Sequence, residues 1–435
     1  MLESVRNAWK IEDLRKKMIF TLMILVVYRI GSVIPVPFLD PAAIAEMVGR
    51  SGNILGYLNT LSGGSFAQCT LFALSISPYI TSSIVMQLLT IAIPYLENLQ
   101  KEGGEEGQKK IKQYTRYAVV ALSFLQAWAY SALLRNMGAM LYTSGWEYYF
   151  ARAVIIFAFA GGSMFLVYLG EQIDSSGIGN GISLILFTGI VSRGGTILLT
   201  MINSLYRAFY GINVFNFVYY PFMVVLAVAA IAFIVIMTNA ERRIPVQYAK
   251  KVVGRKMYGG QSTFIPIKIT MSGVLPVIFA SSIMAIPGTI KDFAGLTADN
   301  SKFWFPLLNS LNYDQIPYAI IYFLLIMAFN YFYVTVQYNP VEIANNLRKN
   351  SGTVPGIRPG RPTSDFIARI VSRTTVMGGI FLSIIAVVPI VVQVITGFSI
   401  SLGGTSLIIV VGVALDSVKQ LESMMMMRHY KGFLE

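Results

Sequence analysis

The chain is dominated by long apolar stretches that are separated by short polar ones. Ten of them are long enough to cross a bilayer, because a hydrocarbon core about 30 Å thick requires roughly 20 mostly apolar residues in a helix. They lie at 19–38, 71–94, 117–134, 153–170, 178–200, 218–238, 270–290, 316–337, 374–396 and 404–421. The pattern predicts an all-α polytopic membrane protein with ten transmembrane helices.

The second stretch differs from a simple span. Small and polar residues fill 59–69, and Ser77 and Pro78 follow shortly afterwards. Proline removes an amide donor and glycines loosen the backbone, so we expect a short half-helix, a break and then a full helix. Broken backbone at this depth must be buried in protein or face water. The pattern is consistent with a mobile element in a water-filled cavity and with a re-entrant loop that only fills space.

The composition agrees with a membrane protein and excludes several kinds of site. Hydrophobic residues make up 55% of the chain and charged residues only 13%, unlike a soluble domain. The chain has one histidine, His429, and one cysteine, Cys69. We therefore expect no metal, no cofactor and no catalysis by a Cys and His pair.

The distribution of positive charge predicts the orientation of the chain. If the N-terminus is cytoplasmic, 26 of the 34 lysines and arginines lie on the cytoplasmic side and seven on the opposite side. This asymmetry follows the positive-inside rule with both termini in the cytoplasm. Part of the net charge of +13 therefore serves to orient the chain in the membrane. DNA is not expected as a partner.

Two cytoplasmic loops, 239–268 and 338–373, hold more charge than orientation requires. The segment 241–268 has seven basic residues and one acid, with the β-branched and turn residues of a protruding hairpin. The segment 348–363 has four basic residues, three prolines, three glycines and no acid. Projecting cationic arms of this kind favour a large anionic partner in the cytoplasm.

Ten spans divide into two sets of five, an N-terminal half at 1–205 and a C-terminal half at 206–435. An odd number of spans in each half makes any structural repeat inverted. A secondary transporter of a small solute shares this organisation, but it requires a charged site near the middle of the membrane. A membrane enzyme is a further alternative, although Glu171 and Asp174 lack a third catalytic partner in the sequence.

Seven segments of the chain resemble the SecY family, the channel subunits of the bacterial Sec translocon. They cover essentially the whole chain in the order and spacing of that family: SISPYITSSIVMQLL, GEEGQKKIKQYTRY, GIGNGISLILFTGIV, ERRIPVQYAKK, SGVLPVIFASSI, NPVEIANNLRKNSGTVPGIRPGRPT and GGTSLIIVVGVALD. The resemblance implies a channel in the bacterial cytoplasmic (inner) membrane rather than an enzyme. Its two inverted five-helix halves form a clamshell around a central pore.

The resemblance also implies the substrates and partners of the channel. Secretory preproteins with signal sequences pass through the pore, and membrane-protein segments leave sideways into membrane lipid. SecE clasps the two halves, SecG binds peripherally, and the motor ATPase SecA or a ribosome docks on the cytoplasmic loops. The ATP chemistry in this scheme belongs to SecA.

The resemblance assigns roles to individual positions. The pore ring comprises Ile76, Ile80, Ile182, Leu186, Ile278 and Ile409. Two of its pairs are spaced i,i+4, which puts both side chains on one helix face. From the residues alone these are core aliphatics, and only the resemblance makes them a pore.

Three further sets follow from the same resemblance. The plug lies at about 61–71 and includes Leu61, Ser62, Gly63, Gly64, Ser65, Phe66 and Ala67. The lateral gate includes Thr81, Gln126 and Ser282. The contact surface for SecA or the ribosome includes Arg242, Arg243, Lys250, Lys251, Arg255, Lys256, Arg358 and Arg361.

Overall fold

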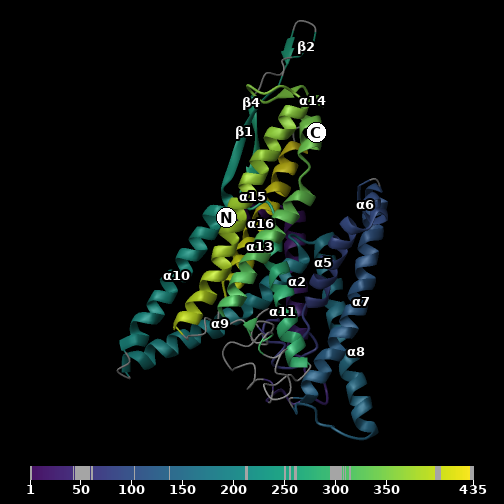
Figure 1. Cartoon of the computed structure of the whole chain (residues 1–435), viewed down its shortest axis with the longest axis vertical. Helices are drawn as coiled ribbons and strands as arrows, with labels where there is room; N and C mark the ends of the chain where they lie inside the picture. Colours follow the sequence, from purple (N-terminus) through teal and green to yellow (C-terminus); the bar gives the residue numbers. More distant parts are fainter. Residues whose placement is uncertain are drawn as a thin grey trace.

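The computed structural model of the protein is an elongated, mainly helical molecule with a small β sheet at one end (Figure 1). It describes residues 2–42, 44, 59, 62–101, 103–136, 138–210, 214–248, 251–253, 256–258, 262–293, 306, 308, 310–312, 315–396 and 403–431.

The N-terminal half contributes helices only, among the residues described. They are α1 (Leu2–Trp9), α2 (Glu12–Gly31), α5 (Ser77–Ala92), α6 (Pro94–Lys101), α7 (Gly104–Asn136), α8 (Trp146–Ser176) and α9 (Gly181–Tyr210). α6 bends away from α5 by 103°.

The C-terminal half combines long helices with short strands. Its elements are α10 (Val214–Asn239), β1 (Glu241–Tyr248), β2 (Lys251–Val253), β3 (Lys256–Tyr258), β4 (Ser262–Lys268), α11 (Leu275–Phe293), α13 (Ile316–Gln337), α14 (Pro340–Lys349), β5 (Gly352–Thr353), α15 (Arg361–Thr396) and α16 (Gly404–Lys431).

Each of the ten predicted apolar stretches overlaps one of the long helices. Among the described residues, five helical segments qualify as membrane spans by length and composition: Gly104–Asn136, Trp146–Ser176, Ile316–Lys349, Arg361–Val394 and Gly404–Met427. The bent pair of α5 and α6 qualifies as a sixth, and α9, α10 and α11 contain shorter apolar helical segments. The structure therefore confirms a helical protein with the apolar helices of a multi-pass membrane protein.

The predicted half-helix before α5 is wrong in form. Residues 62–76 contain no regular helix: they are turns, interrupted at Thr70 by an isolated antiparallel bridge to Pro35. Several residues there have positive φ, including Cys69 at 49° and Ser75 at 52°, and such angles interrupt a right-handed helix. The break itself lies where the sequence predicts it, because α5 begins at Ser77 with Pro78 in its first turn.

The start of α11 is held to two other helices by a buried amide. Asn330 on α13 is 2% exposed, and its Nδ2 donates to the carbonyl oxygen of Thr375 on α15 at 2.7 Å. The hydroxyl of Ser272, in the turn before α11, donates to Oδ1 of the same asparagine. A buried amide that is satisfied from two elements fixes their relative position, so α11 starts at a defined place in the C-terminal half.

The two basic loops join in one sheet with the strand order β4, β1, β5. β1 and β4 form the predicted hairpin, with Ile244 opposite Ile265. β5, which comes from the other loop, pairs with the end of β1 through Gln247 and Thr353. Buried residues from both loops and from α13 to α15, such as Val246 and Val354, pack into one hydrophobic cluster beneath the sheet. The two arms are therefore one structural unit, which the sequence did not indicate.

Candidate functional site

The six aliphatic residues of the predicted ring converge in the centre of the molecule. Four elements carry them: Ile76 and Ile80 at the start of α5, Ile182 and Leu186 on α9, Ile278 on α11 and Ile409 on α16. All six are at least 91% buried, and they belong to a single hydrophobic cluster. Residues more than 300 positions apart in the sequence thus meet in one apolar cluster, to which both halves of the chain contribute.

The segment 62–76, which we call the turn segment, lies next to this cluster. Its last part contributes Phe72 directly to the cluster, where the ring stacks on Tyr28 of α2 with centroids 5.9 Å apart. Its first part is tied together by Asn59, whose Oδ1 accepts from the amide of Ala67 at 3.0 Å. The hydroxyl of Ser62 caps the next turn by accepting from the amide of Phe66 at 3.0 Å.

The turn segment is packed against helices of the N-terminal half on several sides. Tyr130 of α7 donates its hydroxyl to the carbonyl oxygen of Phe66 at 2.9 Å, and the two rings lie 4.6 Å apart. Ser163 of α8 donates to the carbonyl oxygen of Ser75 at 3.1 Å. Phe66 is 4% exposed, so this segment buries more apolar surface than its glycine and serine content suggests.

Glycines allow the closest approaches of this segment. Gly63 has a φ of 67°, and a Cβ at this position would lie 2.9 Å from the carbonyl oxygen of Gly189 on α9. A Cβ at Gly162 of α8 would lie 2.0 Å from the carbonyl oxygen of Leu71. Both positions require glycine, because the neighbouring backbone leaves no room for a Cβ atom.

The three predicted gate residues lie on three helices that meet. α11, which carries Ser282, packs against both α5, which carries Thr81, and α7, which carries Gln126. Two of the three side chains bond within their own helix: Thr81 donates to Ser77 O at 3.1 Å and Ser282 to Ile278 O at 2.9 Å. These two hydroxyls therefore donate within their own helices and not across the seam.

A polar cleft separates α5 to α8 from α13 towards the end that bears the sheet. It has a volume of about 600 Å³, and its walls include Gln87 and Thr90 on α5, Lys112 on α7 and Tyr333 on α13. A second cavity of about 540 Å³ lies between α5, α6 and the helices α13 to α15, and it shares Thr90 and Gln100 with the first. The two cavities share wall residues, so they adjoin each other between helices of the two halves.

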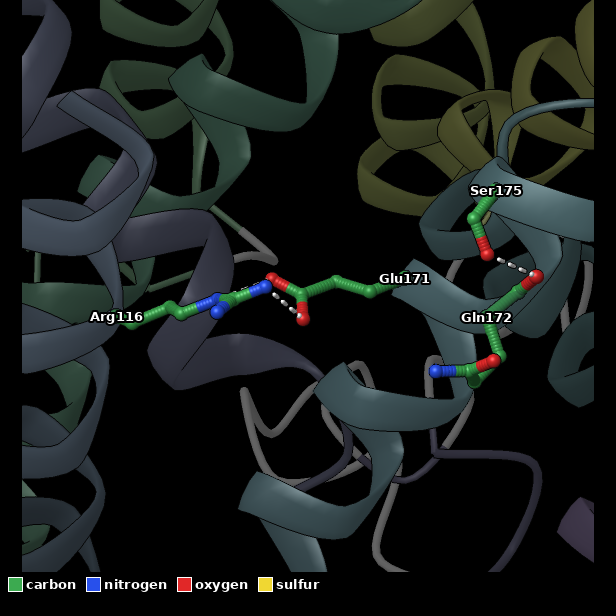
Figure 2. A network of polar contacts seen from close by, with 4 residues as sticks. All are labelled: Arg116, Glu171, Gln172 and Ser175. Atoms are coloured by element: carbon green, nitrogen blue, oxygen red, sulfur yellow. Dashed lines mark hydrogen bonds and ion pairs between the residues drawn. The ribbon is translucent and has the colours of Figure 1, made fainter. Parts of the chain in front are cut away.

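One wall of this cleft carries an ion pair that the sequence did not reveal. Arg116 on α7 donates to Glu171 on α8 through two parallel hydrogen bonds, Nε to Oε1 at 2.8 Å and Nη2 to Oε2 at 2.7 Å (Figure 2). Asp174, one turn further, accepts from the amide of Gly181 at 2.7 Å. Glu171 and Asp174 thus have structural partners, which argues against the catalytic role considered above.

Disrupting this ion pair is expected to have a small effect on stability. The arginine side chain is 61% exposed, and pairs of this kind contribute at most about 1 kcal/mol. We expect Glu171→Gln to lower the free energy of unfolding in detergent by about 1 kcal/mol or less, measured by thermal or denaturant unfolding. The charge-swapped double variant Arg116→Glu/Glu171→Arg should recover most of that loss. A loss of several kcal/mol in the single variant would contradict an exposed pair.

The basic residues of the two arms lie on the exposed sheet unit or near it. Arg242, Arg358 and Arg361 are exposed. Arg243 already has partners within the chain. Its Nε donates to Glu241 at 2.7 Å, and its guanidinium lies 4.6 Å from the Phe264 ring centre. The Glu241 carboxylate partly neutralises the charge of Arg243, which weakens the assignment of Arg243 to the contact surface for a partner.

Two of the other predicted contact residues, Lys251 and Lys256, lie at the tip of the β1–β4 hairpin. Lys251 begins β2 and Lys256 begins β3, and this small antiparallel pair projects beyond the rest of the sheet (Figure 1). Lys250 and Arg255 lie outside the described residues, as does Leu61 of the plug. Within the described part of the chain, no three His, Cys, Asp or Glu residues are grouped as metal ligands.

Comparison with known proteins yields one family and a consistent set of relatives. The model of the SecY family matches residues 70–418. The protein translocase subunit SecY of Streptomyces coelicolor is 41% identical over 450 residues, covering 100% of both chains.

Two solved structures share the fold at lower identity. One, described as the structure of a protein conducting channel, covers 94% of this chain and 91% of its own, with a TM-score of 0.66 and 19% identity. The other covers the same shares with a TM-score of 0.63 and 18% identity. It is described as showing that the plug domain of the SecY protein stabilises the closed state of the translocation channel and maintains a membrane seal.

Proposed function

The chain belongs to the SecY family, and from that membership we propose which of its residues form the path of a translocated polypeptide. As a member of a family of protein translocase subunits, it is a protein-conducting channel and not an enzyme.

The ten long helices span the membrane as two inverted halves, residues 1–205 and 206–435. The overlap of each predicted span with a helix supports this arrangement, and the odd number of spans in each half makes the halves inverted. The basic sheet unit and both termini then face the cytoplasm in agreement with the positive-inside rule. We place the chain in the cytoplasmic membrane of a bacterium, because the relative at 41% identity is a protein translocase subunit of the bacterium Streptomyces coelicolor.

The observation that carries the proposed path is the convergence of six aliphatic side chains from four elements. A channel for polypeptides has to pass many kinds of side chain and still resist ion leakage when idle. An aliphatic collar seals by excluding water and yields by rotamer changes, whereas a charged ring would bind ions. We therefore assign the constriction to Ile76, Ile80, Ile182, Leu186, Ile278 and Ile409, in the closed state.

Cross-linking of a stalled chain tests this path directly. A secretory preprotein halted during translocation and carrying a photoreactive residue should cross-link to Ile80, Ile278 or Ile409 more than to lipid-facing positions such as Val26, which is 57% exposed. Cross-links only to exposed helix faces would place the path outside the cluster. The same experiment separates this function from a transporter of a small solute, which would show no cross-link to a polypeptide.

The first part of the turn segment, residues 62–71, forms the plug of the channel together with Leu61 and adjoins the constriction. Its buried contacts with α7, α8 and α9 support a closed position that must be vacated before a chain passes. Fixing it in place should therefore block transport. In a Cys69→Ala background, we expect the oxidised variant Ser32→Cys/Ser65→Cys to lose most export into membrane vesicles, because Ser65 lies against Ser32 through a 3.5 Å hydrogen bond.

Reduction of that cross-link should restore export, and each single cysteine variant should export normally before and after oxidation. These controls separate the cross-link from the effects of the substitutions. Full export through the oxidised double variant would contradict a plug at this position.

The seam between α5 and α7 on one side and α11 and α13 on the other is the lateral gate. The cleft beside it gives a nascent segment access to the seam, and Thr81, Gln126 and Ser282 lie on the helices that have to part. Their polar groups make the packing between the helices less apolar, so the seam opens more easily than an entirely aliphatic one would.

The sheet unit is the docking surface for SecA or a translating ribosome. Its exposed arginines suit carboxylate and phosphate groups because the guanidinium fork binds either of them in a bidentate manner. SecE and SecG would complete the channel in the membrane by contacting apolar helix faces that are exposed in the isolated chain. Copurification of the full chain with small membrane subunits tests that assembly.

A further inference from the structure

Two arginines lie together at the end of the molecule opposite the sheet. Arg135 is at the end of α7 and Arg152 is near the start of α8, where the two helices pack side by side (Figure 1). Both guanidiniums donate from Nη1 to the hydroxyl oxygen of Tyr148, each at 3.2 Å. The Arg135 guanidinium also lies 4.8 Å from the centre of the Tyr148 ring, so the two cations share one aromatic residue.

Within the described part of the chain, no carboxylate pairs with either arginine. Their partners there are neutral: Arg152 donates from Nε to the Ser131 hydroxyl at 3.2 Å, and its guanidinium lies 5.4 Å from the Trp128 ring centre. Two like charges that converge on one oxygen repel each other, and the repulsion grows where water is partly excluded. Tyr148 is 5% exposed and Arg152 is half-buried, whereas Arg135 is exposed, so an anion at the surface can reach and neutralise both cations.

The phenol of Tyr148 adds a donor to the two cations. Its oxygen accepts from both arginines, and its own proton has no acceptor among the described residues. The site thus presents two guanidinium forks and one hydroxyl proton, and all of them are donors. Tetrahedral phosphate has several acceptor oxygens in different directions, and arginine forks bind it with strong charge-assisted hydrogen bonds.

The surroundings place the site at a membrane interface. Trp128 is 57% exposed on the outward face of α7, and Trp146 at the start of α8 is 81% exposed. Tryptophan and tyrosine concentrate at the level of lipid headgroups. By the proposed orientation this is the outer side, which has only seven of the 34 lysines and arginines, and two of those seven meet here.

We propose that Arg135, Arg152 and Tyr148 bind the phosphate of a phospholipid headgroup in the outer leaflet. The phosphate would neutralise both cations, accept the Tyr148 proton, and leave the acyl chains along the exposed face of α7 beside Trp128. The lipid would join the outer ends of α7 and α8. The inference concerns a lipid site and stands independently of the polypeptide path.

Lipid binding to the purified full chain in detergent tests the proposal. Delipidated protein would be titrated with dihexanoyl phosphatidylglycerol, inorganic phosphate and dihexanoylglycerol, which lacks the phosphate. Thermal unfolding and native mass spectrometry would be the readouts. We expect the phospholipid alone to raise the unfolding temperature and to remain bound as a discrete adduct.

Removing the two charges should weaken that binding at least about tenfold, because hydrogen bonds to ionised groups are the strongest contacts of the site. The test variant is Arg135→Gln/Arg152→Gln. Its matched control is Arg369→Gln/Arg373→Gln, which removes two exposed arginines from α15 and should bind as the wild type does. Tyr148→Phe, which removes only the hydroxyl, should weaken binding by a smaller factor.

The remaining outcomes overturn the proposal. Equal protection by inorganic phosphate would assign the site to a free anion, and equal protection by dihexanoylglycerol would show that the phosphate is not recognised. Unchanged binding in the double glutamine variant would remove the arginines from the site. If that variant does not fold, Arg135→Lys/Arg152→Lys serves instead, since it keeps both charges, loses the forks and should still show weakened binding.

Discussion

Reversing the charge at Arg358 is expected to abolish SecA-driven export while the amount of folded protein in the membrane stays unchanged. The side chain is exposed, and the chain around it turns at Gly356 and Gly360, whose φ angles are 80° and 101°. The Thr363 hydroxyl donates to the Arg358 carbonyl oxygen at 2.8 Å and fixes the turn. Arg358→Glu therefore changes a presented charge and leaves the packing as it was. Such a change acts on association and its salt dependence more than on stability.

Export of a secretory preprotein into reconstituted vesicles measures this effect. Arg348→Glu is the matched control, because Arg348 is an exposed arginine of the same loop at the end of α14. We expect the control to keep most of its export and the Arg358 variant to lose nearly all of it. Equal loss in both would assign the effect to net charge, and normal export by Arg358→Glu would refute the assignment.

The sequence indicated the helices because they depend on local pattern, whereas the ring residues were assigned by the family resemblance. Apolar length identifies a helix that can cross a membrane, and an i,i+4 spacing places Ile182 and Leu186 on one face of α9. The pattern does not say what that face meets. The family resemblance supplied the partners, and the structure brings Ile278 and Ile409 to the same cluster.

The sequence did not indicate contacts that join distant segments. Gln247 and Thr353 are 106 positions apart, and their pairing makes one unit of two loops, neither of which carries a signal for the other. Glu171 likewise has no local partner, since Arg116 lies on a different helix. The sequence predicts a half-helix in the turn segment because small and polar residues interrupt the second apolar stretch. The form of the turn segment is set by outside contacts such as that of Gly63 with Gly189.

A polar residue at the centre of the ring should loosen the closed channel. Ile409 is 1% exposed within the cluster, so the amide of Ile409→Asn would be buried without partners, which costs roughly 1–3 kcal/mol. Opening the constriction lets water reach the amide and relieves that cost. We therefore expect the variant to conduct ions when idle and to export preproteins with defective signal sequences.

The neighbouring residue on α16 provides the matched control for this prediction. Ile408 is 2% exposed but packs in the separate cluster between α10, α11, α13 and α15. Ile408→Asn should lower stability to a similar extent without opening the pore, because its amide faces the core of the C-terminal half. Ile409→Leu keeps the hydrophobic volume and should be nearly silent, at a cost below about 1.5 kcal/mol. The measurements are conductance across planar bilayers and export of a signal-defective preprotein. If Ile409→Asn, Ile80→Asn and Ile278→Asn all match the wild type on both, these residues are ordinary core and the path lies elsewhere.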